Sequence, residues 1–279
     1  MLLKKIFQFL LRIISEKFIK LKLIYLAEFF SMLRASILMG RFVKVKFDGL
    51  DWIYLWKNSA AVSSVCFYNP RLNYSDLDLF FYKYKPKIGD IIVDVGVENG
   101  SEIPEFSRLV GHDGKIVAIE ADPGCCRRLK KLKKILNLKN LIIIEYAIGD
   151  QSKKIKFSQE IDEKNNRVLF NNESHQRFIE IQQLTFEEAL KPFNLKTIDF
   201  VKVNIEGAEM NLLKSLNNSN LVIKNWCISC HDFMGEDFRT YDDVYIWLKK
   251  SKYDVDKYTS NETRGKWRKF YLFGSKINI

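Results

Sequence analysis

Proline and glycine are scarce in this sequence: the 279 residues include 5 Pro and 13 Gly. Together with a hydrophobic fraction of 47%, this scarcity excludes collagen-like repeats, low-complexity chains and general disorder. No run of about 18 uncharged apolar residues occurs, so an ordinary transmembrane helix is not expected. Five cysteines are an odd number without regular spacing, so we expect reduced thiols and a cytoplasmic protein.

Positive charge exceeds negative charge, with 45 Lys and Arg against 34 Asp and Glu, a net charge of +11. This surplus favours an anionic partner such as a membrane, a nucleic acid or a phosphorylated substrate, and a lysine-rich solvated surface explains it equally well. The length predicts one large α/β domain with an appendage. We expect a helical segment over 1–42, a lead-in with a hairpin and a helix over 43–85, and the main domain over 86–279.

The first forty residues have the pattern of a basic amphipathic helix. Leucine, isoleucine and phenylalanine cover most of its circumference. The remaining stripe is polar and consists of Lys4, Lys5, Gln8, Arg12, Ser15 and Glu16. Such a helix can lie peripherally on an anionic membrane, here at its inner face, and it can also pack on the domain or on a second subunit. The sequence leaves both interpretations and the oligomeric state open.

From Gly89 onward, short apolar segments alternate with helical patterns. The expected strands are 91–95, 115–120, 141–144, 198–205, 226–230, 253–257 and 270–273. Continuous apolar strands separated by helices predict a largely parallel sheet that is covered on both faces. An antiparallel pair is expected between the third and fourth strands, at 154–157 and 178–182.

Glycines and acidic residues follow the first two expected strands. The segment Asp94-Val-Gly96-Val-Glu98-Asn99-Gly100 ends one strand and opens a helix, where a ligand can approach the backbone and its free N–H groups. Glu120 ends the next strand, 24 residues after Gly96, and an acid at that distance can bind both hydroxyls of a ribose. Each feature alone is also explained by packing or capping. The pair predicts a ribose-containing ligand, and the missing middle glycine disfavours NAD or FAD.

Three polar residues, Lys202, Asn204 and Glu206, lie toward the carboxyl end of the fourth strand, as expected of a site rather than a core. Cys227-Ile-Ser-Cys230-His231 has the form of a haem c attachment motif, but it lies within an apolar strand of a chain without an export signal. We expect no zinc, because no second Cys/His pair has suitable spacing. His231 follows the strand, where it can act as a general base or simply cap the loop.

These segments resemble the FkbM-type S-adenosylmethionine-dependent methyltransferases over about residues 86–216. The similarity is carried by four segments: Lys87–Gly96, Gly111–Pro123, Ala147–Asp150 and Asp199–Glu209. The resemblance implies a Rossmann-like seven-stranded methyltransferase fold, mostly parallel with an antiparallel last strand. It also implies S-adenosylmethionine as cofactor and contacts to it from Asp94, Gly96, Glu98, Asn99, Gly100, Glu120 and Ala147.

The preferred interpretation is an O-methyltransferase that acts on a hydroxyl of a sugar, glycan or other small molecule. An acceptor that is held at a membrane would fit the N-terminal helix. His231 is the expected base, and Asn204 and Glu206 are expected to orient the acceptor. Asn204 replaces the family's usual Asp, which weakens the case for a metal ion, so none is expected. An RNA methyltransferase is the alternative enzyme, disfavoured because Asn-Ile-Glu-Gly stands where an amino-methylating motif would be. A membrane-associated scaffold without turnover is the alternative outside enzymes.

Overall fold

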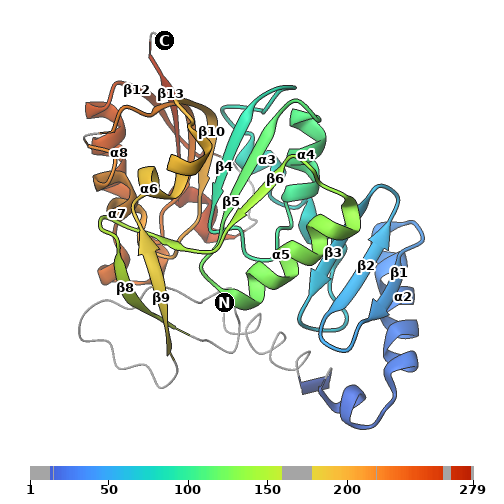
Figure 1. The fold of residues 1–279 in the computed structure, drawn as a ribbon. Coiled ribbons are helices and arrows are strands. Elements are labelled where there is room, and N and C mark those ends of the chain that lie inside the picture. Colours follow the sequence, from blue (N-terminus) through green and yellow to red (C-terminus); the bar gives the residue numbers. More distant parts are fainter. Residues whose placement is uncertain (1–12, 15, 159–177, 218, 260–264, 278–279) are drawn as a thin grey trace.

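A computed structural model describes residues 13–14, 16–158, 178–217, 219–259 and 265–277. Figure 1 shows a large unit built around a central sheet and a smaller sheet with a helix on its outer side. Within the described residues, no helix is both long and apolar enough to cross a membrane. Of the predicted N-terminal polar stripe, all residues but Glu16 lie outside the described part.

The central sheet has seven strands. They are β4 (Ile91–Val95), β5 (Lys115–Ile119), β6 (Leu141–Ile144), β10 (Thr197–Val203), β11 (Val222–Ser229), β12 (Tyr253–Lys257) and β13 (Tyr271–Lys276). Their order is β12-β13-β11-β10-β4-β5-β6, and only β13 runs antiparallel to its neighbours. The predicted mostly parallel seven-stranded sheet is confirmed. Strand order reverses between β4 and β10, and ligands of open α/β sheets bind beyond the strand ends at such a point.

Helices cover both faces of this sheet (Figure 1). The helices of the main unit are α3 (Leu77–Phe80), α4 (Ile103–Val110), α5 (Pro123–Leu136), α6 (Phe186–Leu190), α7 (Glu209–Lys214) and α8 (Tyr241–Lys250). α3, α4 and α5 pack on one face, and α6, α7 and α8 pack on the other. α5 begins where the Asp122 carboxylate accepts the Cys125 N–H at 2.7 Å and Pro123 fills the first helical position, as its sequence predicts.

The helix that the sequence predicts within the lead-in over 43–85 is α3, which is only four residues long. Its N-cap residue is Asp76, which makes no side-chain capping hydrogen bond. The preceding Ser75 hydroxyl donates to the carbonyl of Leu72 at 3.3 Å and to the Asp76 carboxylate at 3.1 Å. In the part of the chain that the structure describes, short 3-10 turns complete the connections: Pro70–Asn73, Lys191–Phe193, Asp232–Met234, Glu236–Phe238 and Lys266–Phe270.

Two smaller sheets accompany the central one. β1 (Lys44–Phe47), β2 (Trp52–Trp56) and β3 (Ser59–Ser63) form an antiparallel sheet, so the predicted hairpin gains a third strand. β7 (Ala147–Ile148), β9 (Phe178–Leu184) and β8 (Lys153–Ser158) form the other, in which β8 and β9 are the predicted antiparallel pair.

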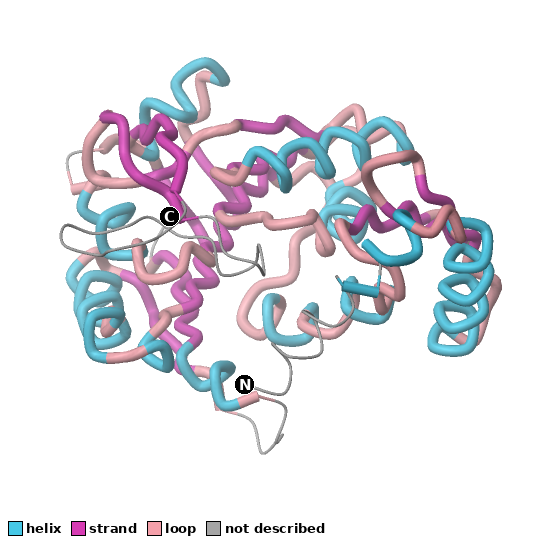
Figure 2. Tube along the Cα trace, turned by 90° about the horizontal axis from the view of Figure 1, so that it is seen from below, coloured by secondary structure: helices cyan, strands magenta, loops and turns pink. Residues whose placement is uncertain are grey.

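The sheet β1–β3 lies between two helices, α5 on one side and α2 (Ile24–Met39) on the other (Figure 1). Seen from below, α2 forms one end of the molecule (Figure 2). Asp51 joins this sheet to the main unit: its buried carboxylate accepts hydrogen bonds from Arg127 Nη2 at 3.0 Å and Lys131 Nζ at 2.7 Å. Arg127 and Lys131, one turn apart on α5, therefore hold the N-terminal sheet against this helix.

Candidate active site

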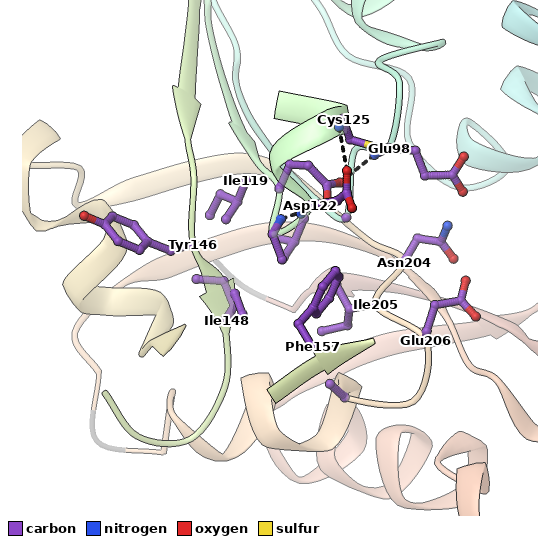
Figure 3. A pocket seen from close by; sticks show the side chains of 16 residues that line it. Glu98, Ile119, Asp122, Cys125, Tyr146, Ile148, Phe157, Asn204, Ile205 and Glu206 are labelled. Atoms are coloured by element: carbon purple, nitrogen blue, oxygen red, sulfur yellow. Dashed lines mark hydrogen bonds between the residues drawn. The ribbon is translucent and has the colours of Figure 1, made fainter. Parts of the chain in front are cut away.

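A pocket of about 610 Å³, open to solvent, lies beyond the carboxyl ends of β4, β5 and β10. Figure 3 shows its lining, with polar Glu98, Asn204 and Glu206 toward one side and apolar Tyr146 and Ile148 toward the other. The full lining is Val95, Gly96, Glu98, Ile119, Glu120, Ala121, Asp122, Cys125, Tyr146, Ala147, Ile148, Phe157, Asn204, Ile205, Glu206 and Ala208.

Glu120 stands at the end of β5, as the sequence predicts, and its carboxylate is held by the backbone. Oε1 accepts the N–H groups of Ala121 and Asp122, both at 2.8 Å, and Oε2 accepts the N–H of Glu98 at 2.7 Å. Burial raises the Glu120 pKa to about 7, although these N–H groups act to lower it. A carboxylate has about four lone-pair sites, so three N–H donors leave room for a further hydroxyl donor.

Gly96 makes the tight turn after β4, with φ +79°. A Cβ built here would lie 1.9 Å from the Asn204 carbonyl oxygen, so only glycine fits between the two strand ends. Gly100 has a different role, because its Cβ would lie 2.6 Å from Leu129 Cδ1 on α5. Its absent side chain allows close packing of the turn on α5, away from the pocket lining.

Asn99 and Asp94 are placed beside the pocket and do not line it. The Asn99 side chain accepts a hydrogen bond from Arg128 Nε at 2.6 Å, which ties the loop to α5. Asp94 is fully buried, and its Oδ1 accepts from Lys202 Nζ at 2.9 Å. Lys202 also lies over the Phe80 ring, on the α3 side of the sheet. Asp94 Oδ2 has no hydrogen-bond partner among the described residues.

β11, the neighbour of β10 in the sheet, ends at a buried cluster of charged side chains. The His231 ring is 2% exposed and lies between two carboxylates, with Nδ1 2.6 Å from Glu209 Oε1 and Nε2 3.4 Å from Glu206 Oε1. Thr240 Oγ1 donates to the second Glu209 oxygen at 2.9 Å. Burial alone would lower the His231 pKa, but the Glu209 and Glu206 carboxylates raise it to about 10.

His231 therefore carries a proton on both nitrogens at neutral pH. A general base must accept a proton, so this charge state does not suit the base role that the sequence suggests. Glu206, its partner, faces the pocket from a left-handed backbone conformation with φ +49°. Such strain in a non-glycine residue is typical of functional turns. Among the described residues, no cluster of His, Cys, Asp and Glu is arranged to hold a metal ion.

A profile of the FkbM methyltransferase domain matches residues 94–255, which is more than half of the chain. The chain belongs to the FkbM methyltransferase family. The resemblance read from the sequence is thereby confirmed, and with it the methyltransferase class of the enzyme. None of the curated proteins matches the chain.

Among solved structures, this FkbM-family chain is similar to an FkbM methyltransferase from Methylobacillus flagellatus, with a TM-score of 0.50 and 14% identity. The alignment covers 71% of this chain and 47% of the other, so this chain spans about half of that protein's length. A SAM-dependent methyltransferase from Aquifex aeolicus gives 0.42 at 18% identity, covering 75% and 97%. Fibrillarin from Aeropyrum pernix gives 0.45 at 12%, covering 84% and 99%. At these identities the likeness concerns the fold alone.

Of the residues that the sequence singled out in this FkbM domain, six line the pocket. They are Gly96, Glu98, Glu120, Ala147, Asn204 and Glu206. Sequence reasoning missed the apolar wall formed by Tyr146, Ile148 and Phe157. Phe157 comes from β8 of the predicted antiparallel pair, but nothing in the sequence places that pair beside the pocket. Asp122 did carry a signal, since an Asp before a proline is a typical helix cap.

Proposed function

We propose that this FkbM-family enzyme transfers a methyl group from S-adenosylmethionine to a hydroxyl of a sugar, glycan or other small molecule. The observation that carries the proposal is the Glu120 carboxylate at the end of β5, fixed by three backbone N–H groups beside the Gly96 turn. This arrangement leaves the carboxylate one further lone-pair site, which suits a ribose hydroxyl as donor.

The charge of the pocket fits the cofactor. Among the described residues, four carboxylates and no Lys or Arg line it; the four are Glu98, Glu120, Asp122 and Glu206. A sulfonium and an ammonium group are attracted to such surroundings, more strongly than in water because the site is partly desolvated. The apolar wall of Tyr146, Ile148 and Phe157 offers a surface for a flat adenine ring. When bound, the cofactor supplies an electrophilic methyl group.

On the acceptor side, the chain's own contribution is positioning and proton removal. Asn204 and Glu206 are the polar side chains of the pocket that come from the turn after β10. We propose that the Glu206 carboxylate accepts the proton of the acceptor hydroxyl and that Asn204 orients that hydroxyl. His231 then acts as a positioning residue, because its imidazolium lies 3.4 Å from Glu206 Oε1 and is itself anchored by Glu209.

The charge of the pocket lining also bears on which acceptor the enzyme uses. Among the described residues, four carboxylates and no basic side chain line the pocket, which disfavours a phosphorylated acceptor, so a neutral hydroxyl compound suits it best. RNA is a polyanion that proteins hold with Lys and Arg, and RNA methylation is therefore not the function we favour. An acceptor held at a membrane, such as a lipid-linked glycan, fits the basic N-terminal segment.

Calorimetry with S-adenosylmethionine tests the proposal. We expect the wild type to bind, and Glu120→Gln to bind about 10- to 100-fold more weakly, since a hydrogen bond to a charged group contributes about 1.5–3 kcal/mol. Glu145→Gln is the matched control, because Glu145 follows β6 as Glu120 follows β5 but lies exposed beside Lys130. No binding by the wild type would favour the non-catalytic scaffold. Equal affinity of the Glu120 variant would remove Glu120 from the site.

A further inference from the structure

The outward side of α2 is apolar along its whole length. Its large side chains there are between 47% and 84% exposed: Tyr25, Leu26, Phe29, Phe30, Leu33 and Ile37. The opposite side of the helix is already packed, since Ala27, Ser31 and Ala35 are fully buried toward β1. A surface helix normally presents polar residues to water. A helix that is apolar on its outward side as well as on its packed side therefore indicates that a partner covers the outward side.

The two charged residues of α2 are turned inward. The Glu28 carboxylate accepts the N–H of Phe47 on β1 at 2.7 Å. The Arg34 guanidinium donates to the carbonyl of Phe67 at 2.6 Å. Neither contributes charge to the outward side, which is therefore free of the acidic groups that would oppose an anionic partner.

The positive charge of the chain is concentrated in its N-terminal sequence. Residues 1–46 contain ten Lys and Arg and two acidic residues, a net charge of +8 out of the chain's +11. In the part of this segment that the structure describes, exposed cations stand at both ends of α2, as Lys17, Lys20 and Lys22 before it and Arg41 after it. An exposed apolar strip with cations at both ends matches the interface of an anionic bilayer, whose core accepts apolar side chains and whose headgroups attract Lys and Arg.

We propose that the outward side of α2 docks on an anionic lipid surface, with Phe29 and Leu33 at the centre of the contact. A second copy of this chain is a poorer occupant, because it would bring two segments of net charge +8 together. This inference deepens the membrane-held part of the proposed function. Vesicle binding is measured without any methyl transfer, so either proposal can fail alone.

Co-sedimentation of the full chain with vesicles tests the contact. We expect pelleting with phosphatidylcholine vesicles that contain 30% phosphatidylglycerol and little pelleting with phosphatidylcholine alone, because each basic residue near an anionic surface adds about 1 kcal/mol, roughly fivefold in affinity. The double variant Phe29→Glu/Leu33→Glu should reduce the partition coefficient at least tenfold. Ile246→Glu is the matched control, since Ile246 is 47% exposed on α8, and it should pellet like the wild type.

Two results would overturn the proposal. One is equal pelleting of the double variant and the wild type with anionic vesicles. The other is a wild type that stays in the supernatant and forms a concentration-dependent dimer by light scattering, with the dimer lost in the double variant. Thermal unfolding of both variants establishes that they are folded, and Lys17→Gln/Lys20→Gln/Lys22→Gln provides a second variant set that leaves the apolar surface unchanged. This triple variant should bind anionic vesicles about a hundredfold more weakly.

Discussion

Replacing His231 by Gln should destabilise the protein strongly and in a pH-dependent way. The substitution removes an imidazolium that is 2% exposed and leaves the Glu209 and Glu206 carboxylates facing each other. Removing one partner of a buried ion pair costs about 3–5 kcal/mol. At about 2–3 °C per kcal/mol for a chain of this size, the melting temperature should fall by about 6–15 °C.

The sign of the pH dependence follows from the raised pKa. His231 titrates near 6.5 when unfolded and at about 10 when folded. Its stabilisation is therefore complete below pH 6.5 and is lost as the pH rises toward 10. The difference in unfolding free energy between the wild type and His231→Gln should be largest near pH 6 and shrink through this window.

Urea unfolding at pH 6, 7, 8, 9 and 10 measures this difference. His112→Gln is the control, because the His112 side chain is 89% exposed. It should leave both the stability and its pH dependence unchanged. If His231→Gln lowers the unfolding free energy by less than 1 kcal/mol, or by an amount that does not vary with pH, then His231 is not a charged imidazolium between two carboxylates.

Three further predictions concern the pocket and its supports. Gly96→Ala should abolish S-adenosylmethionine binding or folding, because its Cβ would collide with the Asn204 carbonyl. Gly49→Ala carries the strain of a positive φ without a nearby atom, so it should cost only about 1–3 kcal/mol and leave binding intact; calorimetry and thermal melts compare the two. Asp51→Asn should destabilise the protein by about 3–5 kcal/mol and speed proteolysis of the N-terminal sheet, by leaving two cations on α5 without their buried carboxylate. Glu206→Gln should lower turnover by about 10²–10⁴-fold with cofactor affinity retained, and wild-type turnover in that variant would exclude Glu206 as the proton acceptor.

The central strands could be predicted because their signal is local. β4 and β6 have the predicted bounds, since a strand buried on both faces is a continuous apolar run between turns. Glu120 could be placed in the site for a similar reason, because its distance from Gly96 is set by one helix and one strand.

The rest depends on contacts between distant segments. Gly100 looked like part of a ligand loop, and its small size is used instead by Leu129 on α5. The charge on His231 could not be predicted because Glu209, 22 residues earlier in the sequence, reaches the ring only in the fold. Phe157 lies on a strand of the predicted antiparallel pair, but no local pattern places this pair beside the pocket.

Helix α5 has two neighbours at once. Its first turn, with Asp122 and Cys125, forms part of the pocket wall, and Arg127 and Lys131 in the following turns grip Asp51 of the N-terminal sheet. Ion pairs thus hold the N-terminal sheet directly against the helix that forms part of the pocket wall. If α2 docks on a lipid surface as proposed, this connection sets the position and orientation of the pocket relative to that surface. Such an enzyme would select its acceptor by position as well as by chemistry. A hydroxyl held too close to that surface, or too far from it, would not reach the pocket.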